Sequence, residues 1–211
     1  ESDRLVIRDG GQISASTFGA GPAGNVDIQA SESIEVAGIL ATDQTNQRIL
    51  ASGIFAQVED DATGDGGSIR LNSPILRVTG GAQIATAARL SGQGGDIIIN
   101  DELDNARLVL LSGTAEGFVS NDNISGLLVS AEEGADGDGG SLVLNADRLI
   151  VEDGARISAD NRGSGAGGSA TIRVDSLIVR QGGEMLAASF DDNPNEPGFD
   201  EVIPTSGGSA G

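Results

Sequence analysis

Several residue types are absent from this sequence. It contains no Cys, His, Trp, Tyr or Lys, and only 2% of its residues are aromatic. Without His, a Ser-His-Asp triad, a His general base and a His metal ligand are excluded. Without Cys, a thiolate nucleophile, a thiolate zinc site and a disulfide are excluded. Because oxidising compartments allow disulfides without requiring them, the lack of Cys does not place the chain inside or outside the cell.

Positive charge is also scarce. All 12 basic residues are Arg, and 32 Asp and Glu give a formal charge of -20. This balance argues against nucleic acid and against anionic membranes as partners. Solubility and resistance to self-association explain the charge most simply, while adaptation to salt and capture of cations remain alternatives. No apolar run is long enough to span a membrane, and the first four residues lack a signal pattern. We therefore expect an interior excerpt of a larger protein without membrane insertion.

What is abundant is glycine, with 33 residues placed in a regular order. A Gly followed by a short alternating strand recurs five times, and a sixth copy begins near the end of the sequence. The spacings of these marks are 43, 28, 45, 28 and 40 residues, so long and short units alternate. The marks are Gly24, Gly67, Gly95, Gly140, Gly168 and Gly208. Such internal periodicity indicates an array of stacked units.

A second motif, Leu-x-(Val/Ile)-x-x-Gly, follows in most units. It starts at Leu5, Leu76, Leu149 and Leu177. The long units carry Ile34-Glu35-Val36 and Val109-Leu110-Leu111 instead, then an insertion, then Ser52-Gly53-Ile54 and Ser125-Gly126-Leu127. Apolar and polar residues alternate in these segments, no segment shows a helical stripe, and turn residues separate them. The chain is therefore expected to be all-β, with about three short strands in each unit.

Equivalent aliphatic residues would stack in columns if each strand paired in parallel with its counterpart one unit later. One expected column is Val26, Ile69, Ile97, Leu142 and Ala170; the next is Ile28, Leu71, Ile99, Leu144 and Ile172; a third contains Ile7, Val78, Val151 and Val179. This pattern predicts one segment over 1–211, a parallel β-helix (solenoid) of about five to six coils of alternating length. Insertions at 42–50, 114–124 and 191–204 should project as loops. A propeller is the main alternative, but its blades are usually more regular and richer in aromatics.

The acidic clusters are the candidate metal sites. The calcium candidates are Asp60, Asp61, Asp65, Asp136 and Asp138, and Asp191, Asp192 and Asp200 occupy the last insertion. Oxygen-rich loops can bind Ca²⁺, but neither an EF-hand loop nor a calcium-binding nonapeptide array is present. Asp and Gly are also the ordinary residues of solvated turns. Calcium is the one cofactor that this pattern leaves open.

No catalytic constellation stands out in the sequence. Paired carboxylates could serve a glycosidase, but Arg70, Arg77, Arg148 and Arg156 are better explained as outward-facing strand residues paired with Asp or Glu. Phe18 and Phe55 are expected to pack under loops. We therefore expect no catalytic or cofactor-binding residues.

Three stretches resemble repeats of large cyanobacterial exoproteins of the filamentous-haemagglutinin-like, two-partner-secretion type. They are 8–19, 30–36 and 52–57. The resemblance implies a right-handed β-helix, export through an outer-membrane transporter partner, and an extracellular or outer-surface location on a Gram-negative bacterium. It also implies an adhesin-like role toward surface glycans or other cell-surface molecules.

The leading interpretation is a non-enzymatic structural and adhesive segment. The alternatives are a carbohydrate-binding or polysaccharide-processing β-helix and a calcium-stabilised matrix or surface-layer component. Open strand edges at the ends of such a stack also predict end-to-end self-association.

Overall fold

The regular structure of the chain is entirely β-strand in the residues described by the computed structural model, which are 2–41, 49–59, 62–89, 92–101, 105–115, 124–132 and 135–189. The all-β expectation is thus confirmed. The first sheet contains β1 (Ser2–Arg8), β3 (Val26–Ala37), β7 (Ile69–Asn72), β8 (Ile75–Thr79), β10 (Ile97–Ile99), β11 (Leu108–Ser112), β13 (Ser141–Glu152) and β15 (Ser169–Val179). The second contains β2 (Gln12–Ser14), β6 (Gly53–Gln57), β9 (Gln83–Ala88), β12 (Gly126–Ala131), β14 (Arg156–Asn161) and β16 (Glu184–Ser189). A separate antiparallel pair joins β4 (Ile39–Ala41) to β5 (Ile49–Ala51).

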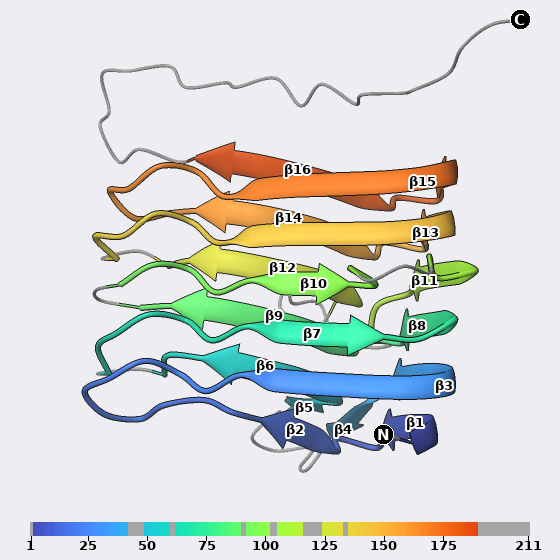
Figure 1. The fold of residues 1–211 in the computed structure, drawn as a ribbon, viewed down its shortest axis with the longest axis horizontal. Coiled ribbons are helices and arrows are strands. Elements are labelled where there is room, and N and C mark those ends of the chain that lie inside the picture. The colour runs from blue at the N-terminus through green and yellow to red at the C-terminus, as the bar shows by residue number, and fades with distance from the viewer. Residues whose placement is uncertain are drawn as a thin grey trace, which may run out of the picture.

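The strands of both large sheets are stacked in layers and pair in parallel (Figure 1). We use "layer" for the strands at one level of the stack. From the N-terminal end the layers are β1 with β2; β3 with β6; β7 and β8 with β9; β10 and β11 with β12; β13 with β14; and β15 with β16. Each layer therefore pairs with the layers directly above and below it.

The predicted columns of aliphatic residues are confirmed. Val26, Ile69, Ile97, Leu142 and Ala170 are successive register partners, and so are the members of the column that begins at Ile28. The third column runs from Ile7 to Val179, and the long units fill its gaps with Val36 and Leu111. The periodicity of the sequence therefore specifies which residues meet.

The predicted right-handed parallel β-helix, a solenoid of five to six coils, is wrong. The pairings of the first sheet close on themselves through six parallel strands, β3-β7-β10-β13-β11-β8, in a barrel-like circuit. The second sheet is a flat parallel sheet of six strands. The closure arises because β3 and β13, each 12 residues long, both pair with two short strands.

The sequence between the two motifs decides where a long strand forms. In β13 the link is Ala146-Asp147-Arg148, which the strand passes through without a break. In the layer of β7 and β8 the link contains Pro74, which has no N–H for a ladder hydrogen bond and so separates the two strands. Between β10 and β11 the break begins at Asn100, which adopts a positive φ of 52°. Three short strands per unit were expected, but β3, β13 and β15 each join two of them.

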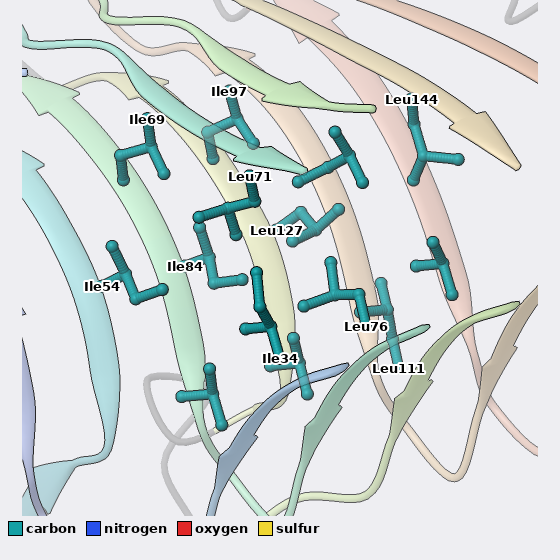
Figure 2. Packing of buried hydrophobic residues seen from close by; sticks show 14 of the residues in the cluster. Ile34, Ile54, Ile69, Leu71, Leu76, Ile84, Ile97, Leu111, Leu127 and Leu144 are labelled. Carbon is teal, nitrogen blue, oxygen red and sulfur yellow. The ribbon is translucent and has the colours of Figure 1, made fainter. Parts of the chain in front are cut away.

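The core lies between the two sheets. Aliphatic side chains from the first sheet (Ile69, Leu71, Leu144) and from the second (Ile54, Ile84, Leu127) point toward one another (Figure 2). All six are at most 1% exposed. Because each column continues through successive layers, this core is continuous along the stack, and each fully buried aliphatic side chain contributes about 1.5–3 kcal/mol.

The recurring glycines mark close approach between layers. A Cβ atom at Gly67 would overlap the carbonyl oxygen of Gly24, and one at Gly95 would overlap that of Gly67. The same relation holds between Gly140 and Gly95. A side chain at these positions would push adjacent layers apart, which gives the sequence marks a physical cause. The last mark, Gly208, lies outside the described residues.

Two of the expected insertions leave the stack beside equivalent glycines. The first forms the β4–β5 hairpin, whose tip at 42–48 lies outside the described residues. The second begins and ends at an antiparallel bridge between Thr114 and Ile124, and its residues 116–123 are also outside them. The third, at 191–204, is not described either.

Candidate functional site

The described acidic candidates lie in the Gly-rich turns that precede β7 and β13. Here the backbone of one layer bonds directly to the next: Gly66 N–H donates to the Gln93 carbonyl at 2.9 Å, and Gly139 N–H donates to the Ala166 carbonyl at 2.9 Å. Successive turns therefore stack as closely as the strands do. We call this flank of the stack the turn edge.

Three of the calcium candidates lie on the turn edge, and each accepts a hydrogen bond from the backbone of another layer. Asp65 Oδ1 accepts from Gln93 N–H at 2.9 Å, and Asp138 Oδ1 accepts from Ala166 N–H at 2.8 Å. Asp136 Oδ1 accepts from Gly92 N–H at 3.1 Å. Hydrogen bonds to a charged acceptor are stronger than neutral ones. These carboxylates therefore act as links between layers.

Two further side chains do the same where the strands begin. Asn25 Oδ1 accepts from Ser68 N–H at 3.0 Å. Asp96 Oδ1 accepts from both Ser141 N–H at 3.0 Å and Ser141 Oγ–H at 2.7 Å. Each residue thus links the start of its own strand to the strand start in the layer above.

Among the described residues, no three or more Asp and Glu side chains converge in a way that could hold a metal ion. Asp60 and Asp61, together with Asp191, Asp192 and Asp200, lie outside those residues. The structure thus places Asp65, Asp136 and Asp138 on the same turn edge without bringing them together as one ligand set.

The arginines form ion pairs between layers, as the sequence predicted for Arg70 and Arg156. Arg70 pairs with Asp101 at 3.0 Å, and Arg156 pairs with Glu184 at 2.7 Å. Arg180 pairs with Glu152 at 2.7 Å across β13 and β15. Arg77 lies beside Glu35 as its register partner, and Arg148 lies beside Ser176. Exposed pairs of this kind contribute about 0–1 kcal/mol each.

The two phenylalanines expected to pack under loops behave differently from each other. Phe18 is 80% exposed, so that prediction is wrong. Phe55 is half-buried, and its ring lies over Gly53, where a Cβ atom would collide with it. Phe55 therefore packs on its own strand.

The ends of both insertions are held by serines that the sequence reasoning did not single out. Ser52 Oγ accepts from Gly10 N–H at 3.0 Å. Ser125 Oγ accepts from Gly81 N–H at 2.9 Å and donates to the Ser112 carbonyl at 2.9 Å. Each serine is 0% exposed and ties the end of an insertion to the layer beneath.

Asparagines that bond to the backbone of a neighbouring layer were also missed. Asn100 Oδ1 accepts from Ser73 N–H at 3.0 Å, and its Nδ2 donates to the Ser73 carbonyl at 3.1 Å. Asn145 Nδ2 donates to the Asn100 carbonyl at 2.7 Å. The signal was present in the sequence, because Asn72, Asn100 and Asn145 each directly follow a member of the same aliphatic column, Leu71, Ile99 or Leu144.

No helix in the described part of the chain is long and apolar enough to cross a membrane. No protein-family model matches the sequence, and neither the curated proteins nor the solved structures contain a significant match to it.

Proposed function

We propose that this chain is a non-enzymatic structural and adhesive segment of a large secreted or cell-surface protein of the filamentous-haemagglutinin type. The observation that carries the proposal is the use of the polar side chains. Three acidic residues, Asp65, Asp96 and Asp138, each bond to the backbone of a neighbouring layer. These polar groups therefore stabilise the stack, which leaves the insertions as the proposed contact surface.

The projecting insertions are the contact elements in this proposal. Gly38, Gly80 and Gly113 follow one another up the stack, since Gly38 N–H donates to Thr79 and Gly80 N–H donates to Ser112. The two insertions leave from Gly38 and Gly113, so both project from the same flank in alternate layers. The β4–β5 hairpin exposes 42% of Leu40 and 38% of Leu50. The partners proposed for this flank are surface glycans or other cell-surface molecules.

The charge of the chain narrows the choice of glycan. A net charge of -20 repels sulfated and uronic-acid polymers at low ionic strength. Neutral or amine-bearing glycans are therefore the expected ligands. Binding should follow the hairpins rather than the stack.

The test is a glycan-array experiment with the full chain and a hairpin-deleted variant. In the variant, residues 38–52 are replaced by Gly-Gly-Ala, the sequence of the tight turn at 80–82. The second layer then has the same turn as the layer above it. We expect the variant to keep its circular-dichroism spectrum and to lose binding. Equal binding by both proteins would contradict a role for this hairpin.

Enzymatic turnover provides a second test. We expect no release of reducing ends from neutral or acidic polysaccharides incubated with the chain. Cleavage that is lost in one Asp variant would overturn the non-enzymatic proposal. The proposed export would be supported by an adjacent gene for an outer-membrane transporter in the parent locus, and a short cytosolic reading frame would contradict it.

A further inference from the structure

The outer face of the second sheet carries very little charge. Along β6, β9, β12 and β14, each of which pairs with a strand on both of its edges, every second side chain points away from the core. The outward residues of the first three strands include no charged side chain, although charged residues make up 21% of the chain. They are Gly53, Phe55, Gln57, Gln83, Ala85, Ala87, Gly126, Leu128 and Ser130. By contrast, Glu35, Arg70 and Arg77 point outward from the first sheet.

Large and small side chains alternate from layer to layer on this outer face. The middle column consists of successive register partners, namely Phe55, Ala85, Leu128 and Ser158. The column beside it has the opposite order, namely Gly53, Gln83, Gly126 and Arg156. The large residues of the middle column lie over the glycines of the other, since a Cβ atom at Gly53 would collide with the Phe55 ring and one at Gly126 would lie 3.1 Å from Leu128 Cδ2. The face is therefore corrugated, with a repeat of two layers.

The corrugation matches a second copy of the same face. A two-fold axis that runs along the strands, midway between β9 and β12, reverses the order of the layers and keeps the direction of the strands. It brings a small residue opposite each large one: Ala85 opposite Leu128, Ser158 opposite Phe55, Gly126 opposite Gln83, and Gly53 opposite Arg156. An axis along the stack would instead place Leu128 against Leu128 and Ala85 against Ala85. Only the first axis brings ridges into grooves.

From this match we propose that two copies of the chain form a dimer through the outer faces of their second sheets, with their stacks running in opposite directions. The third outward column supports the same axis. It places the Gln57 amide of one copy opposite Asp160 of the other. Asp160 Oδ1 is buried and has no hydrogen-bond partner in the described part of the chain. The Gln57 amide donates to the Asp160 carboxylate across the contact, and the two-fold axis forms this bond twice.

The size of the face fits a weak dimer. Six strands about 4.8 Å apart, with five to six residues at about 3.3 Å each, cover about 500 Å² on each copy. The total of about 1,000 Å² is at the lower limit for a specific interface. A flat sheet is also the kind that stacking stabilises. The contact is isologous, so it closes at two copies. The net charge of -20 on each copy opposes it, and salt screens this repulsion.

Sedimentation equilibrium of the full chain tests the proposal. The average mass should rise from that of one copy toward that of two between micromolar and millimolar concentration, and at lower concentration in about 1 M salt, where the Debye length is about 3 Å. Leu128→Glu buries a carboxylate against Ala85 of the other copy and should weaken association about 30-fold or more. Leu110→Glu is the control, because Leu110 points outward from the first sheet in the same layer. A mass that stays monomeric, or equal association of Leu128→Glu and the parent, would overturn the proposal.

A change of size tests the two-fold axis. Ala85→Leu places two large side chains opposite each other and should weaken association about 10-fold. Adding Leu128→Ala to this variant exchanges the ridge and the groove, so association should return to within about 3-fold of the parent. Circular dichroism checks that both variants keep their strands. Stronger association of Ala85→Leu alone would indicate that equal layers face each other, and it would refute this axis.

A change of charge tests the same register at another point. Gln57→Arg places a guanidinium opposite Asp160 twice in the dimer and should strengthen association about 3- to 10-fold. Gln29→Arg is the matched control, because Gln29 points outward from the first sheet in the same layer and the net charge changes equally. Equal effects of the two variants would contradict the proposed register. The result does not depend on glycan binding, so this inference and the proposed function can fail separately.

Discussion

Gly95 is the most direct test of why glycines recur in this chain. A Cβ atom there would overlap the Gly67 carbonyl oxygen and lie 2.9–3.0 Å from the carbonyl carbons of Gly66 and Gly67. The obstacle is backbone that is itself held in place, since Gly66 N–H bonds to Gln93 and Gly67 N–H bonds to Ala56. Gly95→Ala therefore forces two layers apart.

The cost can be worked out from its parts. Overpacking in a tight interior costs about 1–3 kcal/mol. Weakening one interlayer hydrogen bond adds about 1 kcal/mol. The reduced entropy of the unfolded chain returns about 0.4–1 kcal/mol. We expect Gly95→Ala to lower the free energy of unfolding by about 1–4 kcal/mol, a substantial fraction of the roughly 5–15 kcal/mol of a typical domain.

The assay is urea unfolding followed by far-ultraviolet circular dichroism, because the chain has no Trp or Tyr to report by fluorescence. Gly19→Ala is the matched control. A Cβ atom at Gly19 meets no atom within 4 Å, and its φ is not positive. The control should change the free energy of unfolding by no more than about 0.5 kcal/mol. Equal unfolding midpoints for the two variants would refute the close-approach explanation.

Three further predictions concern the links between layers, the core and metal binding. Asp96→Ala removes the acceptor for Ser141 N–H and Oγ–H and should cost about 1–2 kcal/mol in urea unfolding, whereas Asp96→Asn, which keeps an oxygen acceptor, should cost less. Leu144→Ala, at a side chain that is 0% exposed, should cost about 2–5 kcal/mol, and a loss below about 1 kcal/mol would mean that the column is not packed as described. Calcium or chelator should leave the melting temperature unchanged, because Asp65 and Asp138 already bond to backbone N–H groups; a rise with Ca²⁺ but not with Mg²⁺ would restore the calcium alternative.

The sequence was sufficient to predict the columns, because equivalent residues such as Ile69, Ile97 and Leu142 recur with a fixed pattern around each glycine. It was not sufficient to predict how the first sheet closes. That closure depends on whether the chain stays extended between two motifs, and the links 31–33 (Ser-Glu-Ser) and 72–74 (Asn-Ser-Pro) are both short and polar. Pro74 is the local feature that predicts a break between β7 and β8, because it cannot donate a ladder hydrogen bond.

The role of the acidic residues could not be predicted from the sequence for a different reason. An Asp beside a Gly suits a solvated turn and a metal ligand equally well. Its actual partner is an N–H group that lies 28 residues away for both Asp65 and Asp138. Only the register between layers identifies that partner. The ion pair of Arg156 with Glu184, by contrast, follows from the motif itself, because the two residues occupy the same position in successive units.

The alternation of long and short units has a physical explanation in the insertions. Neighbouring strands are about 4.8 Å apart, so a two-stranded insertion is about as wide as two layers. The first hairpin covers the turn below it, since a Cβ atom at Gly10 would touch Leu40 and Leu50; the second insertion covers the turn above it, since one at Gly154 would touch Thr114. Each insertion thus requires a short turn in a neighbouring layer.

The layer of β7, β8 and β9 lies between the two layers that carry insertions, so neither of its neighbours has a short turn that an insertion could cover. Gly80 packs between Gly38 and Gly113: a Cβ atom built on Gly80 would lie 3.4 Å from the Gly38 Cα atom, and one built on Gly113 would lie 3.5 Å from the Gly80 nitrogen. Replacing 80–82 with the hairpin segment 38–52 should therefore lower the melting temperature sharply, whereas the reverse exchange at 38–52 should be tolerated. Thermal unfolding of both chimaeras compares them directly. Equal stability would mean that the flank has room for an insertion in every layer and that the alternation has another origin.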